Sequence, residues 1–413
     1  MGRRVIFHCD INNCYASIEM LHHPKLRGHP VAVGGDAEAR HGIILAKNYE
    51  AKAFGIQVGN TIWEAKQKCP KLLVVPPTYS LYTRVSRDFK AILAEYTDVS
   101  ESFGLDEQWI DVSQSMSLFS SSAEVLANEI RQRVHREIGV TISIGVADNK
   151  IFAKLGSDYK KPDACTVITK ENYKEIVWPL AAGDLLGVGP ATQKKLYGYG
   201  IKTIGAIAAM EPRTLQSWFG KWGLILHVFA NGGDTSPVDA MNSRKNVSVG
   251  NSTTTPRDLV DEGDCHFVFL NLAESVAERV RQLGLKGRTV EISLRDNALH
   301  SITRQRTLQQ PTNLAIEMTD AAMHLLRANY RWEKPLRSIG IRATNFVTED
   351  TNMQISLFDD GRRERLEVVE RTIDDIRHRF GHYSIGRASL LADKTLGWIN
   401  PIADHTIHPV GYF

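Results

Sequence analysis

The stretch "FGLDEQWIDVS", residues 103–113, has the pattern of two short β-strands joined by a turn. Two adjacent carboxylates, Asp106 and Glu107, stand at that turn. Acidic side chains are common at solvated turns for purely local reasons, so the pair is compatible with an ordinary hairpin tip. Carboxylate oxygens are also the ligands that Mg²⁺ prefers, so the pair is compatible with half of a metal site as well. The surrounding sequence has to decide between these two interpretations.

The elements on either side of this hairpin predict an α+β domain. The apolar run "VIFHC" (5–9) is expected to form a strand that ends at Asp10, and "NNCYASIEM" follows it with helical spacing of apolar residues. A long helix is expected at about 80–96, and helices at about 122–138 and 149–158 flank the β-branched strand "VTISIGVA". This order is typical of a mixed sheet with helices packed on one face.

The rest of the chain predicts further domains. Residues 24–77 consist of short elements separated by glycine and proline, and residues 170–232 of short helices joined by glycine-rich turns. Residues 242–346 alternate strands with two helices, and a last helix is expected near 363–381. The polar stretch "NGGDTSPVDAMNSRKN" (231–246) is typical of a linker. The sequence therefore predicts a multidomain α+β protein.

Composition limits the possible partners. At 413 residues and 43% hydrophobic content, the chain can bury several cores. Lys plus Arg number 50 and Asp plus Glu 47, so the formal charge is only +3 and any basic surface must be local. The five cysteines are scattered without a CxxC pair, which predicts neither disulfides nor a zinc site. No apolar stretch is long enough for a membrane anchor, so we expect a soluble, cytoplasmic protein without a membrane partner.

One reaction class suits the acids at the strand ends. Transfer of a phosphoryl or nucleotidyl group is helped most by neutralising charge on the attacking and leaving oxygens, which two Mg²⁺ ions can do. Asp10 at the end of the first strand, with Asp106 and Glu107 at a neighbouring turn, could hold such ions. Their spacing alone does not show that they converge.

Five stretches that occur in order along the chain carry a family resemblance: "CDINNCYASIE", "AKNYEAKAFG", "LDEQWIDVS", "SIGVADNKIFAKLGSDYKKPDA" and "LLGVGPATQKKLYGYGIKTIGAI". Together they resemble the Y-family translesion DNA polymerases, in particular the DNA polymerase IV (DinB-like) branch, over about residues 4–391. The resemblance implies a right-hand-like polymerase with palm, fingers, helical thumb and C-terminal α/β little-finger domain. The implied boundaries are 1–10 and 77–167 for the palm, 11–76 for the fingers, 168–233 for the thumb, 234–241 for a linker, 242–392 for the little finger and 393–413 for a tail.

The resemblance implies a role for the acids of the hairpin. Asp10, Asp106 and Glu107 match the catalytic, metal-binding carboxylates of the family, and the backbone carbonyl of Ile11 is implied as a further ligand. The implied cofactor is a pair of Mg²⁺ ions, with Mn²⁺ as a substitute. Gly104 and Gln108 depart from the usual serine and small residue of this motif, so the level of activity is not predicted.

The nucleotide site follows from the same resemblance. The implied nucleotide-binding residues are Asn13, Cys14, Tyr15, Tyr49, Lys52 and Lys161. Tyr15 matches the steric gate that collides with a ribose 2′-hydroxyl, and backbone N–H groups at the start of its helix suit a triphosphate. Lys52 stands where an arginine is usual, so charge neutralisation is retained but the bidentate grip of a guanidinium is lost.

DNA contacts are expected in two places. "GVGPATQKKLYGYGI" has the pattern of a helix-hairpin-helix, in which Gly187 and Gly189 allow a DNA phosphate to approach the backbone. In the expected little finger, residues 279–306 include seven basic side chains and only two acidic ones, which suggests a local phosphate-binding patch. The individual DNA-binding candidates are Lys245, Arg295, Arg337 and Arg342.

"QISLF" (354–358) lies in a polar, acidic stretch and resembles the motif that binds the bacterial sliding clamp. Its implied anchors are Gln354, Leu357 and Phe358. The alternative is that Leu357 and Phe358 pack under the helix that follows them.

The resulting hypothesis is a template-directed, low-fidelity DNA polymerase that bypasses damaged bases and has no proofreading activity. Its expected partners are primer–template DNA, a dNTP and the sliding clamp, for a monomer in the cytoplasm of a bacterium, associated with the nucleoid. The main alternative is a weakly active or inactive family member that binds DNA and the clamp in a regulatory role. A nucleotide cyclase or a two-metal nuclease could use similar carboxylates, but neither requires the gate, the helix-hairpin-helix and the basic domain together.

Overall fold

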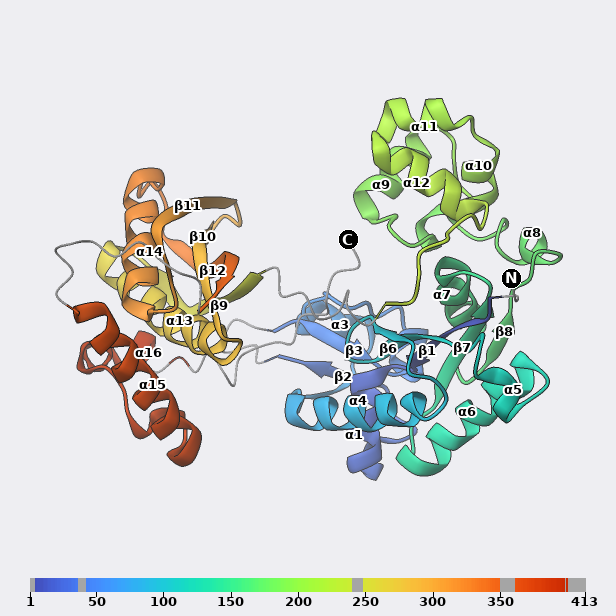
Figure 1. Cartoon of the computed structure of the whole chain (residues 1–413), viewed down its shortest axis with the longest axis horizontal. Coiled ribbons are helices and arrows are strands. Elements are labelled where there is room, and N and C mark those ends of the chain that lie inside the picture. Colours follow the sequence, from blue (N-terminus) through green and yellow to red (C-terminus); the bar gives the residue numbers. More distant parts are fainter. Residues whose placement is uncertain (1–3, 36–41, 240–247, 350–360, 398, 400–413) are drawn as a thin grey trace. The chain divides into compact units, whose positions relative to one another are not determined.

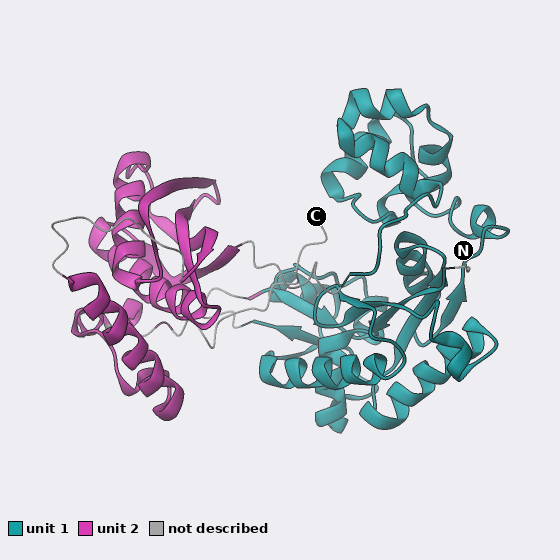
Figure 2. Cartoon of the chain, in the orientation of Figure 1, with its two compact units in different colours: residues 1–35, 43–245, 407–413 teal, residues 36–42, 246–406 magenta. Residues whose placement is uncertain are grey.

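The computed structural model describes residues 4–35, 42–239, 248–349, 361–397 and 399. The chain forms two compact units (Figure 2): unit 1 contains the described residues of 1–35 and 43–245, and unit 2 those of 36–42 and 246–406. Both units combine helices with sheets, as the predicted α+β class requires. None of the described helices is long and apolar enough to cross a membrane.

Unit 1 is built on a five-stranded sheet in the order β5-β6-β1-β7-β8. Its strands are β1 (Ile6–Ile11), β5 (Ser100–Ser102), β6 (Glu107–Asp111), β7 (Ile142–Ala147) and β8 (Cys165–Val167). Neighbouring strands are antiparallel except for β7 and β8, which are parallel. The sheet is therefore mixed, as expected, and the strand that ends near Asp10 lies at its centre.

Helices cover both faces of this sheet (Figure 1), so the prediction of one covered face was wrong. Helix α7 (Lys150–Tyr159) packs on one face, while α4 (Tyr79–Ala94) and α6 (Ala123–Ile138) pack on the other. The reason is visible in β1, where all six residues are buried. A strand buried on both sides lacks the alternation that marks a half-exposed sheet.

Gly145 in β7 allows α7 to approach this sheet closely. A Cβ atom at this position would lie 1.8 Å from the carbonyl oxygen of Ala153 and 2.4 Å from the nitrogen of Ser157. Any side chain here would push the helix away from the sheet. The close contact places the polar side chains of α7 directly over β1 and β6.

A small subdomain follows β1. Helix α1 (Cys14–His22) leads into a three-stranded sheet in the order β3-β2-β4, which the sequence did not predict. The other elements of this subdomain are η1 (Pro24–Leu26), β2 (Val31–Gly34), β3 (Ile44–Lys47), α2 (Tyr49–Ala53), α3 (Ile62–Lys68) and β4 (Leu73–Val75). The short helix α5 (Met116–Phe119) lies outside it, between β6 and α6.

Short helices follow β8, as expected. They are α8 (Tyr173–Ile176), η2 (Ala182–Asp184), α9 (Pro190–Gly198), α10 (Ile204–Ala209), α11 (Pro212–Phe219) and α12 (Lys221–Ala230). The described part of the expected linker is packed against unit 1: Val238 is buried, Arg4 Nη2 donates to the carbonyl oxygen of Ser236 (2.7 Å), and the N–H of Asp239 donates to Glu101 (3.0 Å). A free linker could therefore begin only after Asp239.

Unit 2 contains a four-stranded antiparallel sheet in the order β11-β10-β12-β9. Its strands are β9 (Ser248–Leu259), β10 (Leu285–Asp296), β11 (Ser301–Thr312) and β12 (Leu336–Thr348). Helices α13 (Glu262–Gln282) and α14 (Ala315–Asn329) share one hydrophobic core with this sheet. The predicted alternation of strands with two helices is confirmed.

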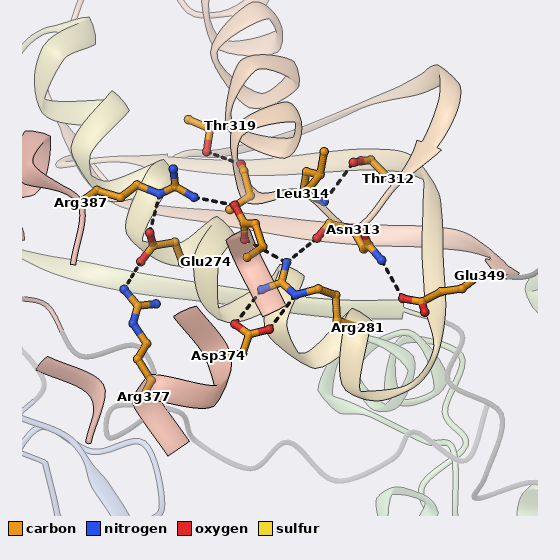
Figure 3. Close-up of polar contacts among 12 residues, drawn as sticks. Glu274, Arg281, Thr312, Asn313, Leu314, Thr319, Glu349, Asp374, Arg377 and Arg387 are labelled. Atoms are coloured by element: carbon orange, nitrogen blue, oxygen red, sulfur yellow. Dashed lines mark hydrogen bonds and ion pairs between the residues drawn. The ribbon is translucent and has the colours of Figure 1, made fainter. Parts of the chain in front are cut away.

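Helix α15 (Arg362–Phe380) adds an ionic layer to unit 2 (Figure 3). Arg281 of α13 donates to Asp374 (2.7 Å) and to the carbonyl oxygen of Asn313 (2.6 Å). Glu274 accepts from Arg377 (2.8 Å) and Arg387 (2.6 Å). The remaining elements are η3 (His382–Ser384), η4 (Ala388–Ala392) and α16 (Lys394–Gly397).

Candidate functional site

Three carboxylate-bearing residues meet at one end of β1. Asp10 in β1 pairs in register with Glu107 in β6, so the two side chains project from the same face of the sheet. The N–H of Ile11 donates to the carbonyl oxygen of Asp106 (3.0 Å), which brings Asp106 to the end of the same strand. The hairpin acids and Asp10, distant in sequence, are therefore neighbours.

Electrostatics also indicate that these carboxylates are close. Burial, and next repulsion from Glu107, raise the pKa of Asp10 to about 6, although Lys161 opposes the change. Burial, followed by repulsion from Asp10 and Glu107, raises the pKa of Asp106 to about 6. A divalent cation with oxygen ligands would relieve this repulsion, so the donor set fits Mg²⁺.

Two lysines approach the same carboxylates. Lys161 Nζ lies 2.7 Å from Asp10 Oδ2, and Lys154 Nζ lies 2.9 Å from Glu107 Oε2. As the side chains stand, no group of three or more His, Cys, Asp or Glu residues in the described part of the chain is arranged to hold a metal ion. Each lysine contacts one oxygen of its carboxylate, so ammonium groups and metal ions would compete for Asp10 and Glu107.

A buried histidine lies beside Glu107. His8 Nδ1 is 2.7 Å from Ser157 Oγ, and His8 Nε2 is 3.5 Å from Glu107 Oε2. Burial, and next the charge of Lys154, lower the pKa of His8 well below its usual value. The imidazole is therefore neutral at physiological pH, and it packs edge-on against Trp109 with 5.0 Å between ring centroids.

The hairpin tip is held by helix α4. Lys90 Nζ donates to the carbonyl oxygen of Gly104 (2.6 Å), and Ser86 Oγ donates to the carbonyl oxygen of Leu105. Gly104 has φ 110°, a conformation that disfavours serine, so this departure from the family pattern matches the local backbone. Gln108 follows Glu107 in β6 and its side chain is buried, so alternation places it on the opposite face from Glu107.

The expected gate lies on the first turn of α1. Tyr15 stacks on Tyr82 with 4.2 Å between ring centroids and meets Tyr79 edge-on at 6.1 Å. Asn13 has φ 48°, and Cys14 is buried. Burial, followed by Asp106 and Asp10, raises the pKa of the Cys14 thiol well above its usual value. Cys14 can therefore offer a nucleotide its backbone N–H but not a thiolate.

The structure brings one of the other nucleotide candidates close to the carboxylates and leaves the second at the surface. The pKa of Tyr49 is raised, mainly by burial. The charge of Lys161 opposes this change and that of Asp10 adds to it, so the phenol interacts electrostatically with both residues. Lys52 is exposed, with Nζ 5.7 Å from the centroid of the Tyr49 ring. Burial, and next the charge of Lys52, lower the pKa of Lys47, a nearby cation that the sequence did not single out.

Gly187 and Gly189, the glycines of the expected helix-hairpin-helix, lie just before and at the start of α9. Gly187 has φ 86°, and Gly189 is the N-cap of α9, with no atom within 4 Å of a Cβ built there. The backbone at Gly189 is therefore open to an approaching group. A hollow of about 610 Å³ lies between this turn and α7, lined by Lys154, Gly187 and Trp222 among others.

Two members of the expected basic patch of unit 2 do not lie on an open surface. Arg281 is buried and paired with Asp374 and Glu370, and Lys286 is paired with Glu367 (2.7 Å). The acids that neutralise these two cations come from α15, far along the chain, so the local count of charges could not reveal them.

The individual DNA-binding candidates have different outcomes. Arg295 and Arg342 are exposed and lie on strands β10 and β12, where the buried alternate residues face the helices, so both arginines are on the open face. Arg337 lies at a register shift in β12, where alternation assigns no face. Lys245 and the expected clamp anchors Gln354, Leu357 and Phe358 lie outside the described residues.

Three residues of the site were missed from the sequence: His8, Lys154 and Asp158. Lys154 and Asp158 do not stand out in the sequence, because a lysine or aspartate on a helix is usually a solvated charge. The available signal was the spacing on α7, where Lys154 and Asp158 are one turn apart and therefore share a face.

Comparison with known proteins agrees with this arrangement. Residues 9–158 match the impB/mucB/samB family, and residues 246–357 match the impB/mucB/samB family C-terminal domain. A DNA polymerase IV of Acetivibrio thermocellus is 49% identical over 399 residues, which are 96% of this chain and 100% of that protein. DNA polymerase IV 1 of Bacillus subtilis is 37% identical over 390 residues, 94% of this chain and 93% of that protein.

A solved structure shares the fold. A Y-family DNA polymerase chimera superimposes with a TM-score of 0.73 and 22% identity, covering 83% of this chain and 99% of that chain. The alignments with the two DNA polymerase IV sequences cover nearly the whole length of both partners, so the similarity is not confined to one domain. This chain belongs to the impB/mucB/samB family of Y-family DNA polymerases, in the DNA polymerase IV branch.

Proposed function

We propose that this DNA polymerase carries out translesion synthesis by adding dNMP units to a primer 3′-hydroxyl at the Asp10, Asp106 and Glu107 site. The observation that carries the proposal is the convergence of these three carboxylates at the end of β1, where burial and mutual repulsion raise the pKa values of Asp10 and Asp106. Two Mg²⁺ ions bound there would supply charge neutralisation on the attacking and leaving oxygens. The carbonyl oxygen of Ile11 is proposed as a further ligand, and Mn²⁺ as a substitute ion.

The chain's own groups have separate tasks in this proposal. The carboxylates position the ions, and the backbone N–H groups of Asn13 and Cys14 bind the triphosphate at the start of α1. Tyr49, Lys52 and Lys161 add hydrogen bonds and positive charge to the phosphates. Tyr15, fixed by its stack on Tyr82, excludes the ribose 2′-hydroxyl.

The proposed domain roles follow the same division. In unit 1, the five-stranded sheet acts as palm, residues 11–76 as fingers and residues 168–233 as thumb, with Gly187 and Gly189 at a DNA phosphate. Unit 2 acts as little finger, with Arg295 and Arg342 on the open sheet face as phosphate contacts. We further propose that the enzyme is a monomer without proofreading, that it binds the sliding clamp through residues 354–358, and that it works in the bacterial cytoplasm at the nucleoid.

Primer extension on an undamaged and on a damaged template tests the proposal. The unmodified chain is expected to add the matched dNTP in the presence of Mg²⁺, and Asp106→Ala is expected to reduce the rate by roughly 10³-fold. Asp98→Ala, which removes an exposed carboxylate away from the site, should extend the primer normally. Template-independent product, or equal rates for Asp106→Ala and the unmodified chain, would contradict the proposed site.

A regulatory family member that binds DNA without extending it is the second candidate. Such a protein would be expected to lose one of the three carboxylates, whereas this chain keeps all of them. Binding of primer–template without any extension by the unmodified chain would favour this alternative.

A further inference from the structure

Both lysines of the site share one more carboxylate, that of Asp158. Lys161 Nζ is 2.7 Å from Asp158 Oδ1, the same distance as to Asp10 Oδ2. Lys154 Nζ is 3.6 Å from Asp158 Oδ2 and 2.9 Å from Glu107 Oε2. Each ammonium group therefore lies between a proposed metal ligand and Asp158.

The end of a helix is an unfavourable position for a carboxylate, even for one whose side chain is 46% exposed as that of Asp158 is. Asp158 lies in the last turn of α7, where the partial negative charge of the helix end disfavours an anion. In the described part of the chain, its hydrogen bonds and ion pairs go to the two lysines. Partial desolvation of this half-exposed side chain opposes its ionisation, but Lys154 and Lys161 outweigh that effect and lower the pKa of Asp158.

We propose that Asp158 is a positioning residue that holds Lys154 and Lys161 when Asp10 and Glu107 turn to divalent cations. The inference rests on the proposed function, because it takes Asp10 and Glu107 as the metal ligands. It adds a residue to which neither the carboxylate motif nor the family resemblance assigned a role.

Ammonium groups and metal ions compete for the oxygens of Asp10 and Glu107. Only 15% of the Lys154 side chain and 23% of the Lys161 side chain are exposed, so leaving either ammonium group unpaired would be costly. With Asp158 present, Lys154 keeps an anionic partner after Glu107 is withdrawn, and Lys161 keeps one in addition to the triphosphate that we propose it binds. Without Asp158, the lysines would hold Asp10 and Glu107 more strongly, and metal binding would weaken.

Metal binding can be measured apart from turnover. Full-length protein is combined with a dideoxy-terminated primer–template and the matched dNTP, and free Mn²⁺ is followed by its electron paramagnetic resonance signal during a titration. We expect Asp158→Asn to bind Mn²⁺ about tenfold more weakly, the lower end of the effect seen for groups that orient metal ligands. Asp158→Glu should restore most of the affinity. Glu137→Gln, which removes a surface ion pair with Arg133 on α6, should bind like the unmodified chain.

A double-mutant cycle separates the proposed role from a general effect of charge. In a chain that carries Lys154→Met and Lys161→Met, the change Asp158→Asn should have no further effect on Mn²⁺ affinity. A full tenfold loss in that background would overturn the inference, since Asp158 would then act without the lysines. Unchanged affinity in the single Asp158→Asn variant would also overturn it. If the unmodified chain bound DNA but no Mn²⁺, the proposed metal site itself would fail, and the inference with it.

Discussion

Tyr15 lies in the first turn of α1, yet its ring is held by a helix much further along the chain. It stacks on Tyr82 of α4 at an interplanar angle of 12°. Tyr82 is fully buried, and its hydroxyl donates to the buried carboxylate of Glu19 (2.5 Å). Because Glu19 lies on the same helix as Tyr15, α1 and α4 hold each other at two points. The orientation of Tyr15 is therefore fixed by packing, as a steric filter requires.

Replacing Tyr15 tests that filter. Tyr15→Ala should raise the ratio of rNTP to dNTP incorporation by roughly 10²-fold, because the ring that would collide with the 2′-hydroxyl is gone. Tyr15→Phe keeps the ring and its stack on Tyr82, and should leave the ratio nearly unchanged. Single-nucleotide extension with each sugar measures both values. An unchanged ratio in Tyr15→Ala would show that another group excludes ribonucleotides.

The candidate site was partly predictable from the sequence at this scale. Asp10, Asp106 and Glu107 were identified because an acid ends a buried strand and two more stand at a turn. Lys154 and Asp158 were not, since their role depends on how closely α7 approaches β1 and β6. That approach is set by Gly145 on a different strand, and only the folded chain shows it.

At the scale of elements, α7 links the site to the rest of unit 1. One side carries Lys154, Ser157 and Asp158, which face the polar end of β1 and β6. Ile151 and Phe152 of the same helix belong to the core shared with the short helices that follow β8. A displacement of α7 would therefore affect the site and the core together.

Gly145→Ala should produce such a displacement. The added Cβ would overlap the backbone of α7 at Ala153, so we expect a loss of about 3–5 kcal/mol in the unfolding free energy of unit 1. Primer extension should fall as well, because Lys154 moves with the helix. Gly198→Ala is the matched control: it has open space at the end of α9 and should change stability by less than about 1 kcal/mol. Equal stability of the two variants in denaturant unfolding would contradict the close contact.

A buried ion pair joins the start of α7 to strand β5. Lys150 Nζ lies 2.6 Å from Glu101 Oε2, with 1% and 5% of the two side chains exposed. Lys150→Met would leave the Glu101 carboxylate buried without its cation, so we expect a loss of about 3–5 kcal/mol in denaturant unfolding. Lys170→Met removes an exposed lysine 3.8 Å from Asp148 and should cost less than about 1 kcal/mol. A similar small effect of Lys150→Met would show that water reaches Glu101.

Most long elements were predicted within a few residues, while the small ones were not. Helices α4 and α6 show clear apolar periodicity, and the structure places them at Tyr79–Ala94 and Ala123–Ile138. The sheet β3-β2-β4 was missed because its strands have only three or four residues, too few to show alternation. Coverage of both faces of the larger sheet was missed because helix order alone does not assign faces.

At the scale of the whole molecule, the two units are stabilised in different ways. Unit 1 has separate hydrophobic cores on the two faces of its sheet. Among its described residues, unit 2 has one core, and α15 is joined to α13 by several ion pairs with little exposure, including Arg281 with Asp374 and Arg377 with Glu274. An acid that is little exposed in such a layer can have a raised pKa when nearby cations do not fully balance its negative charge. The unfolding free energy then depends on pH.

Glu278 of α13 provides the test of that dependence. Burial, and next repulsion from Asp374, raise its pKa above the ordinary value of 4.5, although His378 opposes the change. A carboxyl with a raised pKa in the folded state binds more protons there than in the unfolded state, so stability falls as the pH rises through that range. Glu278→Gln mimics the protonated form. It should therefore stabilise unit 2 by roughly 0.5–2 kcal/mol at about pH 8 and by much less at about pH 4.

Hydrogen exchange of the α13 amides reports this difference on unit 2 without requiring the whole chain to unfold in one step. Glu262→Gln, which removes an exposed ion pair with Arg327, is the control and should change α13 protection by little at either pH. Greater protection in Glu278→Gln at the higher pH alone would agree with the raised pKa. Loss of protection at the higher pH would mean that ionised Glu278 stabilises the fold through His378, 3.1 Å away, and that burial is not the dominant cause.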